Sequence, residues 1–189
     1  MGKKKIVIVI GILVVLLGGY YFYLSNYKMP KEETELTKVQ EVLLRNLATD
    51  YPPTPREVIK YYSEITKCLY NESYTEEQFE QMADKLLALY DSELAANNPR
   101  EQYLVDLKKD VNDFLEKNYS IVKYTVSSST DVESFTHEGR ECAKLYCTYS
   151  IKSGADYKSS QQVFILRKDT NDGHWKIFGF DIVTPENQN

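Results

Sequence analysis

The sequence has few of the residues that usually carry metal or catalytic chemistry. It contains two histidines, three cysteines and one tryptophan among 189 residues. Three cysteines cannot all pair within one chain, and Cys68, Cys142 and Cys147 are best interpreted as small buried hydrophobes. Cys142 and Cys147 are five residues apart, which places them on opposite faces of a strand, so we do not expect them to pair. A disulfide between Cys68 and one of them stays open.

Catalytic and metal-binding motifs are scarce as well. His137, Cys142 and Cys147 match no standard zinc spacing, and no fourth ligand is evident. No nucleophile elbow of the form G-x-S-x-G occurs. The sequence therefore predicts no metal and no cofactor, and it favours a non-enzymatic protein.

Basic residues are in deficit once the N-terminus is set aside. The formal charge is −5. Without Lys3, Lys4 and Lys5 the chain has 20 basic and 28 acidic side chains. An acidic domain without a basic stripe repels phosphate groups, which argues against nucleic acid and against direct binding to anionic lipid headgroups.

One long apolar run is present, over residues 6–24, and it carries no charge. A helix of that length at about 1.5 Å per residue spans roughly 28 Å, enough to cross a bilayer core. The lysines before it favour an inside N-terminus, and the aromatic residues 20–23 suit the outer interface. A cleaved signal peptide is the competing interpretation, but no small-x-small site follows the run.

These features predict a single-pass plasma-membrane protein whose domain lies outside. The expected parts are a cytoplasmic tail (1–5), a transmembrane anchor (6–24), a linker or stalk (25–53), an extracytoplasmic domain (54–184) and a short tail (185–189). Apolar residues recur at helical spacing within 34–47. Whether that segment is a stalk helix or packs on the domain stays open.

Three helices are expected after Pro52-Pro53, each with its own start signal. Thr54 and Thr75 each begin a capping box, and Asn98 followed by Pro99 is a third start. Apolar residues follow each start with a helical period, including Tyr90 and Leu94 in the second helix.

After Asn118 the apolar period changes to two, which is typical of strands. Four strands are expected, around 122–126, 143–151, 163–166 and 175–182, with turns at 153–156 and 170–173. Short connections imply antiparallel neighbours. The sequence therefore predicts an α+β domain in which three helices pack on a four-stranded antiparallel meander.

The order of helices followed by a curved antiparallel sheet, from about Thr54 to Val183, is similar to the nuclear-transport-factor-2-like or cystatin-like cone. That resemblance implies a pocket between sheet and helices. The segments YPPTPREVIKYYSEITKCLYNE and GRECAKLYC resemble uncharacterised membrane-anchored proteins of Gram-positive gut bacteria, which implies a cell-envelope location. The layout also resembles scaffold subunits of secretion and conjugation machines.

Asp181 is the one catalytic candidate. It lies in the apolar stretch F-G-F-D-I-V, on the parity of Trp175 and Ile177. A carboxylate among apolar neighbours can act as a general base, as in cone-fold isomerases. The alternative is a solvated carboxylate near the end of the strand.

The sixteen tyrosines are the most distinctive bias. A tyrosine combines apolar area with a polar hydroxyl, so a group of them can line a cavity or a partner surface. The principal binding candidates are Tyr61, Tyr124, Tyr149 and Trp175, and the wider set adds Tyr62, Tyr70, Tyr90 and Tyr146. The alternative is an ordinary core whose hydroxyls reach its rim.

Together these observations favour a membrane-anchored, non-enzymatic domain that binds a protein partner or a small ligand at the cell envelope. A scaffold subunit of a secretion or conjugation complex is the second hypothesis. A cone-fold enzyme that uses Asp181 as base is the third.

Overall fold

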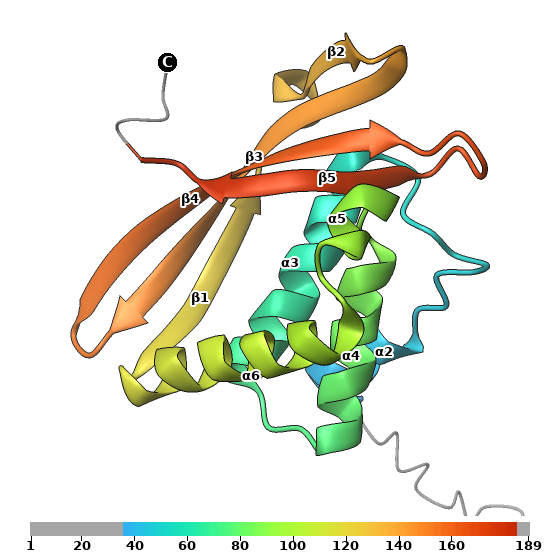
Figure 1. Cartoon of the computed structure of the whole chain (residues 1–189). Coiled ribbons are helices and arrows are strands. Elements are labelled where there is room, and N and C mark those ends of the chain that lie inside the picture. The colour runs from blue at the N-terminus through green and yellow to red at the C-terminus, as the bar shows by residue number, and fades with distance from the viewer. Residues whose placement is uncertain (1–35, 185–189) are drawn as a thin grey trace, which may run out of the picture. The chain divides into compact units, whose positions relative to one another are not determined.

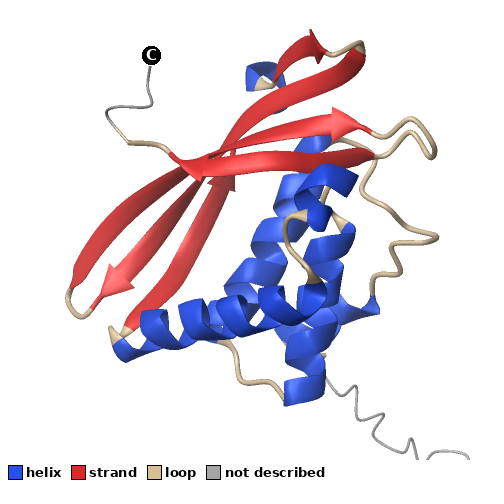
Figure 2. Cartoon of the chain, in the orientation of Figure 1, coloured by secondary structure: helices blue, strands red, loops and turns tan. Residues whose placement is uncertain are grey.

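The computed structural model describes residues 36–184. Helices come first in this part of the chain and lie on one face of an antiparallel sheet (Figures 1 and 2), so the expected α+β class is confirmed. The helices are α2 (Lys38–Leu44), α3 (Pro55–Asn71), α4 (Glu76–Ala88), α5 (Ser92–Ala96) and α6 (Arg100–Glu116). Within 36–184 no helix has the length and apolar character to cross a membrane. The anchor expected at 6–24 lies outside the described residues.

The central helix α3 begins and packs as its sequence predicts. The Thr54 hydroxyl accepts a hydrogen bond from the backbone N–H of Glu57, and Pro55 occupies the first turn, where its missing N–H costs nothing. Val58, Ile65 and other residues of one face are fully buried in the core. This face lies against β1, β3 and β5, so α3 forms one side of the space between the helices and the sheet.

The domain begins earlier than the predicted boundary at residue 54. The compact unit starts at Leu36. Helix α2 has a complete capping box between Thr37 and Gln40, and Val39 on its inner face is 1% exposed. Because α2 packs on α3 and α4, it is an element of the domain, and it is not part of a linker.

The second predicted helix is interrupted. Helix α4 has the expected capping box at Thr75 but ends at Ala88. The segment that follows α4 then pairs with Ile177 in the manner of a strand. The Ile177 N–H donates to Leu89 O, and the Ile177 carbonyl accepts from Asp91 N, both at 2.8 Å. Asp91 next caps the short helix α5. Sheet hydrogen bonds therefore override the helical period that includes Tyr90.

The third start is displaced by one residue. Pro99 is the N-cap of α6, and the Asn98 amide instead donates to Leu94 O at 2.7 Å. Asn98 thus closes α5, whereas we expected it to cap α6. In Figure 1, α6 runs crosswise to α3 and α4.

The sheet has five strands, where four were expected. They are β1 (Tyr119–Val126), β2 (Glu133–His137), β3 (Arg140–Ser153), β4 (Asp156–Lys168) and β5 (Trp175–Ile182). The order is β1-β3-β4-β5, and β2 pairs with the start of β3 on the edge that β1 leaves free. Strand β2 is exposed along its whole length, so it lacks the apolar alternation that identifies strands.

A bulge in β5 changes which residues face the helices. Ile177 pairs with Leu166 and Gly179 pairs with Ile165, so Phe178 is an extra residue in β5. The bulge inverts the parity of the residues after it. Ile177 and Phe180 therefore face the helices, and Asp181 faces the opposite side of the sheet. The predicted shared parity of Asp181 and Ile177 was wrong for this reason.

The three cysteines are buried and free, as expected for small hydrophobes. Cys147 lies in the core between sheet and helices, whereas Cys142 lines a depression on the outer face. The two residues therefore occupy opposite faces of β3.

Candidate functional site: a tyrosine-lined cavity

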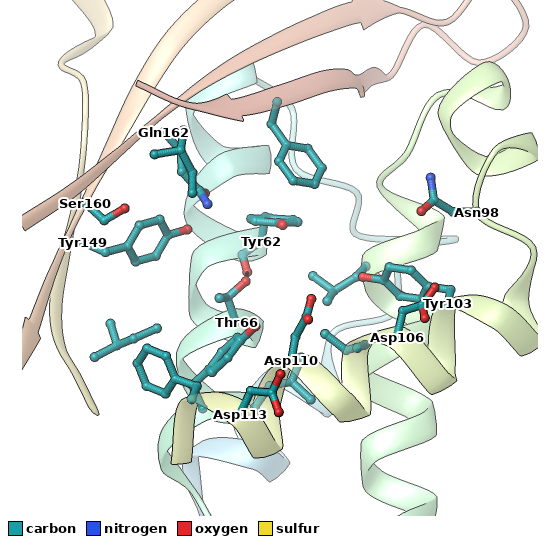
Figure 3. A pocket seen from close by; sticks show the side chains of 18 of the residues that line it. Tyr62, Thr66, Asn98, Tyr103, Asp106, Asp110, Asp113, Tyr149, Ser160 and Gln162 are labelled. Carbon is teal, nitrogen blue, oxygen red and sulfur yellow. Dashed lines mark hydrogen bonds between the residues drawn. The ribbon is translucent and has the colours of Figure 1, made fainter. Parts of the chain in front are cut away.

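A cavity of about 640 Å³ lies between the helices and the inner face of the sheet. Helix α6 contacts α3, α4 and β1, and it spans the end of the helical layer. Side chains of α3, α6 and all the long strands line the cavity, as Figure 3 shows from close by. The volume is within the range of small-molecule sites.

Aromatic rings form much of the cavity wall. Tyr62 of α3 contacts Phe180 of β5, with ring centroids 5.9 Å apart. Tyr70, two helical turns further along α3, meets Phe114 of α6 edge to face at 4.8 Å. Positions 62, 66 and 70 are four residues apart, which places them along one face of a helix. The bulge at Phe178 is what directs Phe180 into this wall.

Four tyrosines of the wall have raised pKa values. Burial raises the pKa of Tyr70 to about 12, and it raises the pKa values of Tyr62, Tyr90 and Tyr149 further. The Tyr149 hydroxyl is 2.8 Å from Ser63 Oγ, in the core behind the wall. At neutral pH these groups act as hydrogen-bond donors and acceptors and carry no charge.

Three carboxylates extend from α6 at the cavity. Asp106, Asp110 and Asp113 are spaced by four and three residues, so they share one helical face, and Figure 3 shows them on the side opposite Tyr149. Among residues 36–184, Lys117 is the single basic residue of the lining. The carboxylates were missed in the sequence, although their spacing beside the apolar stripe of α6 was the signal that could have found them.

The four binding candidates do not converge on one site. Tyr149 lines the cavity. Tyr61 and Tyr124 line a separate groove between α2, α3 and β1, where their hydroxyls donate to Val42 O and Glu64 Oε1. Trp175 lies at the start of β5, against the Lys168 ammonium. From the wider tyrosine set, Tyr62, Tyr70 and Tyr90 line the cavity with Tyr149.

Asp181 is exposed on the outer face of the sheet. Its Oδ1 accepts a hydrogen bond from the N–H of Ile182, and it borders an open apolar depression with Phe135 and Phe178. The general-base hypothesis required a carboxylate enclosed in a pocket. Asp181 is exposed, so its position does not supply that enclosure.

The described residues contain no cluster of metal-ligating side chains. His137 and Cys142 border the same outer depression as Asp181, and Cys147 is on the other face of the sheet.

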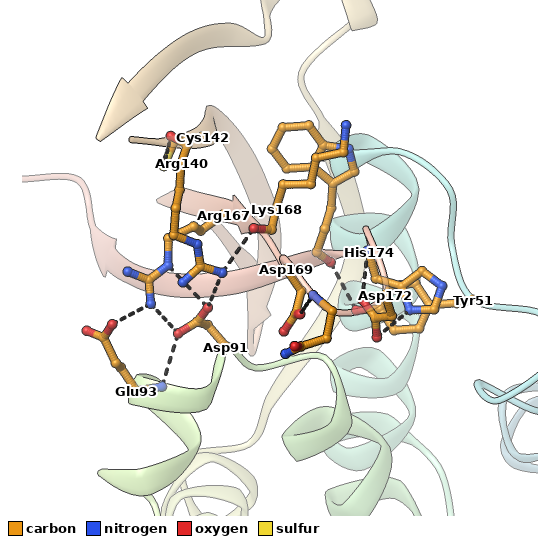
Figure 4. A network of polar contacts seen from close by, with 12 residues as sticks. Tyr51, Asp91, Glu93, Arg140, Cys142, Arg167, Lys168, Asp169, Asp172 and His174 are labelled. Carbon is orange, nitrogen blue, oxygen red and sulfur yellow. Dashed lines mark hydrogen bonds and ion pairs between the residues drawn. The ribbon is translucent and has the colours of Figure 1, made fainter. Parts of the chain in front are cut away.

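A second polar assembly lies at the far end of the sheet (Figure 4). The buried guanidinium of Arg167 donates from Nε to Asp91 Oδ2 at 3.2 Å and from Nη2 to Glu93 Oε1 at 2.6 Å. Arg140 Nη2 lies 3.5 Å from the same Asp91 carboxylate. Burial opposes the charge of Asp91, but hydrogen bonds from Arg167 and from Glu93 N, with the nearby guanidinium charges, hold its pKa below the usual value.

The geometry defines a mixed α+β domain with an open, tyrosine-lined cavity between its two layers. The chain belongs to the family described as a domain of unknown function (DUF6715), whose match covers residues 1–180. No curated protein matched the sequence.

Proposed function

We propose that this protein is a membrane-anchored, extracytoplasmic, non-enzymatic domain that binds a small ligand in the cavity between its helices and sheet. The observation that carries the proposal is the cavity of about 640 Å³, walled by aromatic rings with a few polar groups among them. Ligand sites combine a mostly apolar concave wall with a small number of orienting polar groups.

The chemistry of the lining favours binding over catalysis. Burial raises the pKa of Tyr149 above the ordinary value for tyrosine, so its hydroxyl carries no charge at neutral pH, and it is already paired with Ser63. No histidine or cysteine is among the lining residues within 36–184, so the lining lacks the pairs in which a serine or cysteine is activated by a histidine. Asp181, the base proposed from the sequence, is on the opposite face of the sheet.

The location and the fold family are further parts of the proposal. The apolar segment 6–24, with its three preceding lysines, supports an inside N-terminus and an outside domain. The helices on one face of the sheet, with a cavity between the layers, support the likeness to the nuclear-transport-factor-2-like cone.

A cavity-blocking variant tests the binding function. Ser160 of β4 lines the cavity, and its neighbour Ser159 points to the other face of the strand. We expect the full-length protein to bind the neutral fluorescent probe N-phenyl-1-naphthylamine saturably. Ser160→Trp should weaken that binding about tenfold or more, because the indole fills the site. Ser159→Trp adds the same side chain outside and should leave the affinity unchanged.

Thermal unfolding followed by circular dichroism shows whether each variant is folded. If Ser160→Trp does not fold, Gln162→Trp repeats the test from the next inward position of β4. Absence of saturable binding by the unmodified protein, or equal affinity in the blocked and control variants, would contradict the proposal.

A further inference from the structure

We propose that the cavity selects an amphipathic cation: a small organic amine whose apolar body lies against the tyrosine wall and whose ammonium group meets Asp110 and Asp113. This inference rests on the proposed function, because it names the class of ligand that the same cavity takes.

The first argument is the charge of the lining. Within residues 36–184 the charged lining residues are Asp106, Asp110, Asp113 and Lys117, which gives a net charge of −2. The carboxylates come from one side of the cavity, whereas the sheet side contributes the neutral groups of Ser160 and Gln162. An asymmetric field of this kind attracts a cation and orients it, and it repels carboxylates and phosphates.

The second argument is that Asp110 and Asp113 are unpaired among the described residues, whereas the basic residues Arg100 and Lys108 of α6 pair with acids of α4. Arg100 Nε lies 2.6 Å from Asp84 Oδ1, and Lys108 Nζ lies 2.6 Å from Glu76 Oε1. Asp106 accepts a hydrogen bond from the Gln102 amide. Within residues 36–184, neither Asp110 nor Asp113 makes an ion pair. Within the same residues Glu101 and Glu116 of α6 make no ion pair either, so what distinguishes Asp110 and Asp113 is that they line the cavity, where a ligand can meet them.

The third argument is the aromatic wall beside these acids. Ring faces attract cations, as the Lys158 ammonium 5.6 Å from the ring centroid of the lining residue Tyr119 illustrates, and the lining has several further aromatic rings. The rings of Tyr70 and Phe114 meet edge to face at 4.8 Å, and both residues line the cavity together with Asp110 and Asp113. Burial is the main cause of the raised pKa of Tyr70, and the negative charge of Asp110 is the next. The Asp110 carboxylate therefore acts electrostatically on this part of the wall.

The remaining wall defines the other end of the ligand. Tyr62, Phe180 and Ile151 supply apolar surface away from the α6 carboxylates. A hydrophilic cation would leave this surface unused, and a purely apolar ligand would leave the carboxylates unpaired. An amine with an aromatic or aliphatic body satisfies both halves of the cavity.

Three probes with the same naphthyl body test the inference on the full-length protein. They are 1-naphthylmethylamine, 1-naphthalenemethanol and 1-naphthylacetate, which differ mainly in charge. Fluorescence titration should give the amine the highest affinity, about tenfold above the alcohol, with the carboxylate weakest. Raising the salt concentration from about 0.05 to 0.5 M should weaken the amine and spare the alcohol, because exposed carboxylates are screened.

The double variant Asp110→Asn/Asp113→Asn should abolish the preference for the amine while it retains the affinity for the alcohol. The matched control is Glu101→Gln/Glu116→Gln, which removes the same charge from α6 outside the cavity. A preference that survives in the Asn variant, or is lost equally in the Gln control, would overturn the inference.

The outcomes separate this inference from the proposed function. If the alcohol binds as tightly as the amine and Ser160→Trp blocks both, the cavity binds ligands but does not select cations. If none of the three probes binds, and N-phenyl-1-naphthylamine does not bind either, both proposals are wrong.

Discussion

The protein holds acidic side chains in two opposite ways. At one end of the sheet, Asp91 is completely buried and surrounded by guanidinium groups from Arg167 and Arg140. At the cavity, Asp110 and Asp113 are exposed and have no ion-pair partner among residues 36–184. The first assembly is closed and contains its own counter-charges. The second is open and leaves its charges to the surroundings.

The difference separates a structural charge cluster from a candidate binding site. A buried ion pair has lost its water, so each partner depends on the other. Asp110 and Asp113 stay hydrated until a ligand displaces their water, so their charges cost the fold little free energy. We therefore expect the buried, ion-paired Asp91 to govern stability, and the unpaired Asp110 and Asp113 to govern binding.

Removal of Asp91 should give the largest effect. In Asp91→Ala the Arg167 guanidinium stays buried with only the exposed Glu93 carboxylate beside it. Breaking a buried pair by deleting one partner typically costs about 3–5 kcal/mol. Urea unfolding should therefore show a stability loss of about that size, and the cap of α5 is lost with it.

Glu93→Gln is the control for that experiment. Its side chain is 60% exposed, so loss of its contact with Arg167 should cost only about 1 kcal/mol or less. Similar losses in the two variants would show that the closed assembly is less dependent on Asp91 than the geometry indicates.

Acid should break the same assembly by titration. The folded pKa of Asp91 lies below its usual value of 3.8, so the stability that Asp91 contributes is fully present above pH 3.8. It is lost as the pH falls through the lower, folded pKa. Urea unfolding between pH 5 and 2 should show a steeper loss for the unmodified protein than for Asp91→Asn. Parallel curves would contradict this assignment.

The layers of the fold could be predicted because their signals are local. Thr54 and Thr75 begin helices through hydrogen bonds to residues three positions later, and the turn around Gly154 joins strands that are adjacent in the chain. The errors occurred where distant contacts decide the structure. Tyr90 leaves its predicted helix because residues 89–91 bond to Ile177, a partner far along the chain.

The site was harder to predict because one irregular residue determines its wall. The tyrosine bias was consistent with a cavity or a partner surface, and periodicity gave Asp181 the same parity as Ile177. Phe178 adds one residue to β5, which turns Phe180 inward and Asp181 outward. A bulge between two apolar residues leaves no compositional trace. The α6 carboxylates were visible at helical spacing, yet only the fold shows that they face a cavity.

The smallest expected effect tests whether the open carboxylates are kept at some cost to the fold. Asp113 lies in the last turn of α6, where no basic residue is present and the helix dipole disfavours a negative charge. Asp113→Asn should therefore stabilise the protein by roughly 0.3–1 kcal/mol in urea unfolding. Glu116→Gln, in the same turn but outside the cavity, should stabilise it similarly. Only Asp113→Asn should also weaken binding of 1-naphthylmethylamine. If Asp113→Asn destabilises the protein, Asp113 has a structural role and belongs with Asp91, which would remove the contrast between the two assemblies.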